Sequence, residues 1–336
     1  MKKNILITGS SGFIGSFIVE EAIKRNYTTF AGIRKSSSKE YLTNTNIHFL
    51  ELNFSNENAL DQSLQEFTTQ YGKFDYIIHS AGLTKAKNKE DYFSVNYDNT
   101  KRFIHALQKN NLVPNKFLYI SSLASFGSGL GDLPITQNQP QQPLTAYGDS
   151  KRKAEEFLLQ TPNFPSVIIN PTAVYGPREK DFYLLLKSIE KHFEIYIGSK
   201  NQLLSFVHVY DLVDAIFLAM ESSIVNERVL VSDGEVYNPK IVNDFIKKIM
   251  NRKTISFTIP KYPTRALAII TETIGKLSGS IPILNRERLK EFEAMNWSVD
   301  CSPLKNIGYK PTYTLENGLQ QTIQWYQENG LLKKNR

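Results

Sequence analysis

The chain has one cysteine among its 336 residues and no long run of apolar residues. Cys301 has no second cysteine with which to form an internal disulfide, which suits a reducing compartment, so we expect a cytoplasmic protein. No stretch approaches the roughly 18 consecutive apolar residues that a membrane-spanning helix requires. The sequence therefore excludes a disulfide scaffold and predicts no membrane span.

Metal-ligand spacing and a concentrated basic surface are also missing. The five histidines and the single cysteine occur in no pattern typical of a metal site. The net charge is +7, from 40 basic and 33 acidic residues, but the lysines and arginines are scattered and rarely alternate with aromatic residues. We interpret them as solvated faces, predict no nucleic-acid partner, and attribute part of the positive charge to an anionic cofactor.

Short apolar segments alternate with segments of helical periodicity over the first 230 residues. Strands are predicted at 5–7, 28–33, 48–52, 74–79, 116–120, 166–169 and 228–231, and helices at 57–71, 99–109 and 146–159. Such alternation is typical of an α/β fold, a doubly wound parallel sheet of the Rossmann type, here with about seven strands.

The regularity ends after Gly176. We predict a dinucleotide-binding domain formed by residues 1–176 and about 205–252, and a smaller, mostly C-terminal substrate-binding domain formed by about 177–204 and 253–336. Within the smaller domain we expect helices at 182–192 and 315–328. Between about 255 and 286, an apolar helix is expected, which is interpreted as core or pocket wall rather than a lipid contact.

Three glycines at a spacing of three follow the first predicted strand, in Thr8-Gly9-Ser10-Ser11-Gly12-Phe13-Ile14-Gly15. A strand, a glycine turn and a helix bring backbone N–H groups and the positive helix end to a pyrophosphate. The alternative is a glycine-rich turn that binds nothing. We predict that the cofactor contacts in this turn come from Gly9, Ser11, Gly12, Phe13, Ile14 and Gly15.

Ser122, Tyr147 and Lys151 are the candidate catalytic residues. Tyr147 and Lys151 are one helical turn apart, so both can face one cleft. The ammonium favours the phenolate, which would move the tyrosine pKa down from its usual value near 10. Ser122, at the end of the fifth strand, can hydrogen-bond the same substrate oxygen; Ser121 is the second choice.

The glycine turn, Ser122 and Tyr147-Gly148-Asp149-Ser150-Lys151 together resemble the extended short-chain dehydrogenases/reductases, often called the NAD-dependent epimerase/dehydratase family. The resemblance covers residues 3 to about 235. The other segments that match are His79-Ser80-Ala81-Gly82, Val95-Asn96, Pro171 to Arg178, and Phe206 to Val213. It implies hydride transfer between nicotinamide C4 and a carbinol carbon, with Tyr147 moving the proton and Lys151 binding the nicotinamide ribose.

The resemblance also implies further contacts. Beyond the glycine turn, the cofactor-binding residues are expected to be Arg34, Asn53, Phe54, Ser80, Ala81, Gly82, Asn96, Tyr147, Lys151, Pro171 and Val174. Asn96 could act through a backbone kink or a bound water, or could simply cap a helix. His208 is interpreted as structural rather than catalytic. A homodimer through the helices at 99–109 and 146–159 is possible.

The form of the cofactor is predicted from the end of the second strand. An NAD site typically has a carboxylate there that accepts from the ribose 2′-OH. This chain has Arg34, followed by Lys35, and a guanidinium pairs well with a 2′-phosphate. We therefore favour NADP(H), with NAD as the alternative.

Departures from the family pattern indicate the substrate class. Dehydratases of the family carry acidic residues where this chain has Leu123-Ala124, and epimerases carry an Arg-Asp pair at Leu204-Ser205 and an asparagine at Ala173. Asn170, where many relatives have arginine, is unexplained by the sequence.

The pattern is most similar to dihydroflavonol reductases and 3β-hydroxysteroid dehydrogenases. We predict an NAD(P)-dependent oxidoreductase acting on a small-molecule carbonyl or alcohol; the alternatives are a nucleotide-sugar epimerase and a non-catalytic cofactor-binding subunit.

Overall fold

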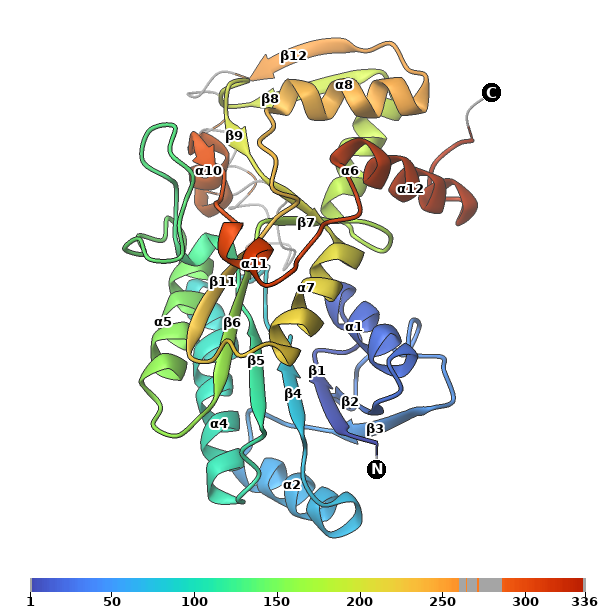
Figure 1. Cartoon of the computed structure of the whole chain (residues 1–336). Helices are drawn as coiled ribbons and strands as arrows, with labels where there is room; N and C mark the ends of the chain where they lie inside the picture. Colours follow the sequence, from blue (N-terminus) through green and yellow to red (C-terminus); the bar gives the residue numbers. More distant parts are fainter. Residues whose placement is uncertain (1, 260–263, 265–270, 272–285, 335–336) are drawn as a thin grey trace.

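The computed structural model describes residues 2–259, 264, 271 and 286–334, and its centre is a seven-stranded parallel sheet (Figure 1). The strand order is β11-β6-β5-β4-β1-β2-β3. The strands are β1 (Asn4–Thr8), β2 (Thr28–Ile33), β3 (Ile47–Glu51), β4 (Tyr76–His79), β5 (Lys116–Ile120), β6 (Ser166–Pro171) and β11 (Glu227–Val231). The predicted fold is confirmed, with strand ends displaced by at most two residues.

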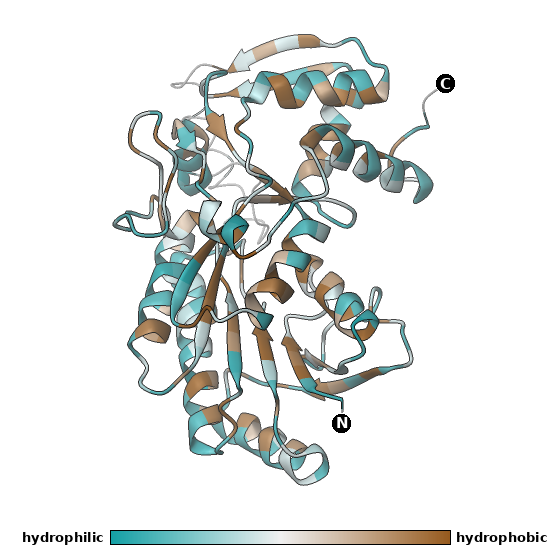
Figure 2. Cartoon of the chain, viewed as in Figure 1, coloured by the Kyte–Doolittle hydropathy of each residue, from teal (hydrophilic) through white to brown (hydrophobic). Residues whose placement is uncertain are grey.

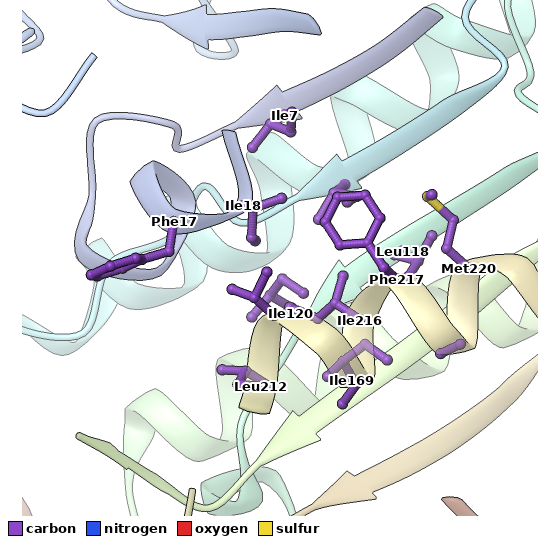
Figure 3. Close-up of a cluster of buried hydrophobic side chains, with 14 of the residues drawn as sticks. Ile7, Phe17, Ile18, Leu118, Ile120, Ile169, Leu212, Ile216, Phe217 and Met220 are labelled. Carbon is purple, nitrogen blue, oxygen red and sulfur yellow. The ribbon is translucent and has the colours of Figure 1, made fainter. Parts of the chain in front are cut away.

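Helices cover both faces of this sheet, which explains why the middles of its central strands are apolar. On one face lie α1 (Phe13–Lys24) and α7 (Val209–Glu221); on the other lie α2 (Glu57–Tyr71), α4 (Asn99–Lys109) and α5 (Ala146–Gln160). Ile5 and Ile7 of β1 belong to the core under α1 and α7, whereas Leu6 belongs to the opposite core. Figure 3 shows the first core, in which Ile7 lies near Ile18 and Phe217.

A second core lies beyond the carboxyl ends of the strands. It is formed by α6 (Asp181–Glu190), α8 (Pro239–Met250) and α12 (Leu315–Glu328) together with β7 (Ala173–Tyr175) and β10 (Phe206–His208). The helices predicted at 182–192 and 315–328 are therefore present. The domain boundaries stay a prediction, although α8, which we placed in the first domain, packs in this second core.

Short parallel strand pairs in this region were not predicted. β8 (Phe193–Ile197) pairs with β12 (Ile255–Ile259), β9 (Leu203–Leu204) with β13 (Asn296–Trp297), and β10 with β7. Strands of two to five residues with distant partners carry little periodicity of their own. The segment from about 255 to 286 begins with β12, and the apolar helix predicted within it lies outside the described residues, with its positions Ala266, Leu267, Ile269, Ile270, Ile274 and Leu277.

The remaining described elements are short and surround the end of the sheet. They are α3 (Lys89–Tyr92), the π-helix η1 (Phe93–Asp98), the 3₁₀ turn η2 (Leu123–Ser125), α10 (Arg286–Glu293) and α11 (Ser302–Asn306). In Figure 2, hydrophobic colour concentrates on the central strands, and the helices that flank them carry much of the hydrophilic colour. Among the described residues, every helix is too short or too polar to cross a bilayer.

Candidate active site

The three candidate catalytic residues come together where β5 ends. Ser122 caps η2 and hydrogen-bonds the side chain of Tyr147. Lys151 Nζ donates to the carbonyl of Ile120, the last residue of β5, at 2.9 Å. Ser121, the second choice, instead donates its hydroxyl to Glu155. The geometry therefore favours Ser122 as the serine that faces the tyrosine.

The protonation states of Tyr147 and Lys151 differ from the expectation. Burial raises the pKa of Tyr147 to about 12, against the opposing hydrogen bond from Ser122. Burial also lowers the pKa of Lys151 to about 8, and the Glu155 carboxylate opposes that shift. The predicted downward shift of the tyrosine pKa is wrong for this structure, because burial removes the phenol from water while the Lys151 ammonium donates to Ile120. Near neutral pH, Tyr147 is protonated.

The glycine turn forms a cradle that side chains would fill. Gly9 has φ +67°, and a Cβ there would lie 2.6 Å from the backbone of Ser80 and Ala81. A Cβ on Gly15 would lie 2.1 Å from the Gly9 carbonyl oxygen. The Gly12 N–H donates to that same oxygen at 2.9 Å and closes the turn. The turn precedes the N-terminus of α1, so it fits a dinucleotide pyrophosphate.

Gly82, Asn96 and Lys151 also meet at one point. A Cβ on Gly82 would lie 3.1 Å from both Asn96 Oδ1 and Lys151 Nζ. Asn96 accepts from the Leu83 N–H at 2.7 Å and donates to Ser150 Oγ at 3.0 Å. It lies inside η1 rather than at a helix start, so the helix-cap interpretation is wrong, and the π-helical backbone agrees with the kink interpretation.

The other predicted cofactor-binding residues lie at or near the carboxyl ends of the strands, and they differ in exposure. Arg34 is exposed directly after β2, and Asn53 is exposed and accepts from Ser55. The Phe54 ring packs edge-on against His79, with centroids 5.6 Å apart. Ser11, Phe13 and Ile14 are half-buried in the glycine turn, Ser80 and Ala81 follow β4, Pro171 ends β6, and Val174 lies in β7. Their roles in binding stay predictions.

The buried histidines are structural. His208 accepts from the Tyr210 N–H at the start of α7 and stacks on Tyr313 with centroids 4.1 Å apart. His79 links β1 to α4 through contacts to the hydroxyls of Thr8, at 2.7 Å, and Thr100, at 3.1 Å. Burial, with a smaller contribution from the Lys151 charge, lowers the pKa of His79 to about 3. It is neutral in the folded protein.

The protonation of His79 predicts acid sensitivity. The unfolded state binds a proton at this residue below about pH 6.5, whereas the folded state does so only near its depressed pKa of about 3. Its contribution is present above pH 6.5 and falls as the pH drops, by at most about 1.4 kcal/mol per pH unit. Urea unfolding at several pH values should give a shallower pH dependence in His79→Gln than in the wild type. Equal slopes would contradict this.

Several polar residues near the site belong to no sequence motif and were not predicted. Asp181, at the start of α6, pairs with Lys85 at 2.5 Å and with Arg288 at 2.7 Å, which joins the loop after β4 to two elements beyond the sheet. Glu155 forms a buried network with Asn170, and only the unexplained identity of residue 170 pointed to it. No cluster of potential metal ligands occurs in the described ranges 2–259 and 286–334.

A seven-stranded Rossmann sheet with a serine, tyrosine and lysine beside a glycine cradle defines an extended short-chain dehydrogenase/reductase. The chain belongs to the NAD dependent epimerase/dehydratase family, whose model matches residues 5–238. The resemblance drawn from the motifs is thereby confirmed, and the protein is an enzyme of this family.

Relatives of different activities align over almost the whole chain. N-acetyl-alpha-D-glucosaminyl-diphospho-ditrans,octacis-undecaprenol 4-epimerase of Escherichia coli O157:H7 is 28% identical, over 97% of this chain and 96% of its own. Sterol-4-alpha-carboxylate 3-dehydrogenase, decarboxylating, of Dictyostelium discoideum is 25% identical, over 95% and 99%. The crystal structure of WbmG of Bordetella bronchiseptica in complex with NAD shares the fold, with a TM-score of 0.78 and 18% identity over 99% and 96%.

Proposed function

We propose that the protein is an NAD(P)-dependent oxidoreductase that transfers a hydride between nicotinamide C4 and a carbonyl or alcohol carbon of a small molecule with a substantial apolar part. The observation that carries the proposal is the meeting of Ser122, Tyr147 and Lys151 at the end of β5. The glycine cradle at the same edge of the sheet supports it, as does the relative named a sterol 3-dehydrogenase.

Each residue of the triad has a distinct role. Ser122 hydrogen-bonds the substrate oxygen and holds it while charge develops. Tyr147, protonated near neutral pH, donates its proton to that oxygen in the direction of carbonyl reduction and takes it back in oxidation. Lys151 binds the ribose and stabilises negative charge on the phenol oxygen. A bound nicotinamide nucleotide supplies or accepts the hydride.

The residues at the positions where relatives carry charged groups support an apolar substrate. Leu123 and Ala124 follow Ser122, so the acid and base that a dehydratase needs are absent from these positions. Ser205, at a position where epimerases carry a charged residue, donates its hydroxyl to the backbone carbonyl of Glu235 at 2.9 Å. Its neighbour Leu204 pairs with Tyr237 through the backbone. These positions offer no cation for a diphosphate.

A diphospho-sugar 4-epimerase is the second candidate, and the relatives favour it. The Escherichia coli relative is named for a sugar joined to undecaprenol through a diphosphate, and a Vibrio cholerae relative named UDP-glucose 4-epimerase is 28% identical. An epimerase takes a hydride from the sugar and returns it to the opposite face. The non-catalytic alternative is disfavoured, because a protein that only binds the cofactor has no need of all three triad residues.

The two candidates differ in the fate of the hydride. Purified protein would be incubated with NAD or NADP and, separately, with ketones, steroid alcohols, and uridine- and thymidine-diphosphate sugars. The oxidoreductase produces or consumes reduced nicotinamide in a one-to-one ratio with product. An epimerised sugar without net change in the cofactor would overturn the proposal and establish the second candidate.

We further propose that NADP(H) is the preferred cofactor, although WbmG is in complex with NAD. The exposed Arg34 at the end of β2 supports this. We expect NADP to raise the melting temperature more than NAD, because at equal concentration the ligand with the lower dissociation constant stabilises the folded state more. Arg34→Ala should remove the difference, whereas Lys73→Ala, at an exposed site before β4, should keep it. A larger shift with NAD in the wild type would contradict the prediction.

The oligomeric state is also proposed rather than established. The faces of α4 and α5 that point away from the sheet are where a homodimer would form in the arrangement that the family resemblance implies. Light scattering on the purified protein tests it: a mass near twice 38.4 kDa supports the dimer, and a mass near 38.4 kDa excludes it.

A further inference from the structure

Glu155 is a buried carboxylate that the proposed reaction does not use. It lies one turn after Lys151 on α5, and its side chain is 0% exposed. Four side chains donate to it: Ser121 Oγ and Asn170 Nδ2 (2.7 Å) to Oε1, and Gln141 Nε2 (2.7 Å) and Arg228 Nε (2.7 Å) to Oε2. Burying a carboxylate is costly unless it is paired and hydrogen-bonded. Here both oxygens are satisfied by elements distant in the sequence.

The same network holds the turn that carries the catalytic serine. Asn170 Nδ2 also lies 3.2 Å from the Ser122 carbonyl oxygen and 3.1 Å from Ser125 Oγ. Ser125 Oγ donates to that same Ser122 carbonyl at 2.9 Å. Ser121, the residue before Ser122, is held through its hydroxyl by Glu155. Glu155 therefore holds Ser121 directly and the Ser122 carbonyl through Asn170.

Glu155 is also the acidic residue among the groups around Lys151. On α5 these groups are Tyr147 and Glu155; from β4 comes His79, and from β5 Tyr119, whose ring centroid is 4.7 Å from Lys151 Nζ. Burial keeps the two tyrosines protonated and His79 neutral near pH 7. Among these groups, the charged partner of the Lys151 ammonium is the Glu155 carboxylate, which itself pairs with Arg228.

We propose that Glu155 is a positioning residue: its carboxylate, held by Arg228 and Asn170, fixes the turn of Ser122 and stands one helical turn from Lys151. The same carboxylate opposes the effect of burial on the Lys151 pKa. This deepens the proposed function and rests on it for the role of Lys151. It also accounts for Asn170. An asparagine amide can reach Glu155, Ser122 and Ser125 together, while β11 supplies the guanidinium through Arg228.

Two matched variants separate this role from a merely structural one. Glu155→Gln removes the negative charge beside Lys151, whereas Arg228→Gln removes the positive charge beyond it; both break the same buried pair. The readouts are the alkaline limb of the pH profile of kcat and the NMR titration of Lys151 Cε in the protein without substrate. The second readout does not depend on activity.

We expect opposite shifts in the two variants. In Glu155→Gln the midpoint of Lys151 should fall by about 0.5 to 1 pH unit, and the alkaline limb of kcat should fall with it. In Arg228→Gln the midpoint should rise, because the guanidinium no longer offsets the Glu155 charge, and Glu155→Asp should keep the wild-type value. An unchanged midpoint in Glu155→Gln, or an unchanged or lower one in Arg228→Gln, would overturn the proposal.

If Glu155→Gln does not fold, Arg228→Gln decides the question, because a raised Lys151 midpoint supports the proposal and an unchanged or lower one overturns it. The proposal and the proposed function also fail separately. If Tyr147→Phe is inactive while the titration midpoint of Lys151 is the same in Glu155→Gln and in the wild type, only the positioning role is wrong. If Tyr147→Phe is fully active, the triad itself is wrong, whatever the Lys151 titration shows.

Discussion

Replacing Tyr147 by phenylalanine is expected to lower kcat by about 10²- to 10⁴-fold, the contribution typical of a positioned acid or base. The phenylalanine ring keeps the packing of the buried tyrosine but has no proton to give to the substrate oxygen. The affinity for the cofactor should change little, because the glycine cradle and the exposed Arg34 lie elsewhere along the edge of the sheet. Initial rates and a cofactor titration of the same preparation measure both.

Tyr92 provides the control for this variant. Its ring lies 5.9 Å from the ring of Tyr147, and its hydroxyl accepts from the Ala86 N–H at 3.1 Å. Tyr92→Phe also removes a phenolic hydroxyl near the site, yet it should reduce kcat less than about tenfold, since no role in proton transfer is assigned to it. Equal losses in the two variants would indicate that the tyrosines act through packing and would refute the acid–base role.

Replacing Gly9 by alanine is expected to abolish detectable cofactor binding, with a loss of at least about 100-fold in affinity, or about 2.7 kcal/mol. Two effects add at this position. An alanine at φ +67° is strained, and its methyl group would lie 2.6 Å from the Ser80 carbonyl. The turn must therefore move, and the N–H groups that would face the pyrophosphate move with it.

Gly131→Ala isolates the strain from the collision. Gly131 has a similar φ of +60°, and no heavy atom lies within 4 Å of the position of its added Cβ. It should lose about 1–2 kcal/mol of stability and keep the full melting shift with cofactor. If Gly9→Ala retained that shift, the cradle would not be the dinucleotide site.

The central sheet could be predicted because the local pattern of apolar and polar residues in each strand and helix reflects its burial. Strands buried on both faces, such as β1 and β5, have a continuous apolar middle, and the apolar residues of the helices between them repeat every three to four residues. The second core could not be predicted to the same extent. β9 and β13 have two residues each and exist because distant segments meet, so local sequence does not specify them.

The candidate site also has features that the sequence predicted and features that it did not. Ser122, Tyr147 and Lys151 could be named because their order and spacing form a motif. The pKa of Tyr147 was predicted in the wrong direction, because the burial that raises it depends on the whole fold. Arg228 carried no motif at all. Its role depends on β11 lying beside β6, which brings it to Glu155.

The most direct test of hydride transfer through this triad is the absorbance of reduced nicotinamide during turnover. The substrate is the one identified among the ketones, steroid alcohols and diphosphate sugars. The account predicts that reduced cofactor forms or disappears one-to-one with product in the wild type, and that this signal is lost in Tyr147→Phe at saturating cofactor. Product formation without any change in the nicotinamide, or an undiminished signal in Tyr147→Phe, would contradict it.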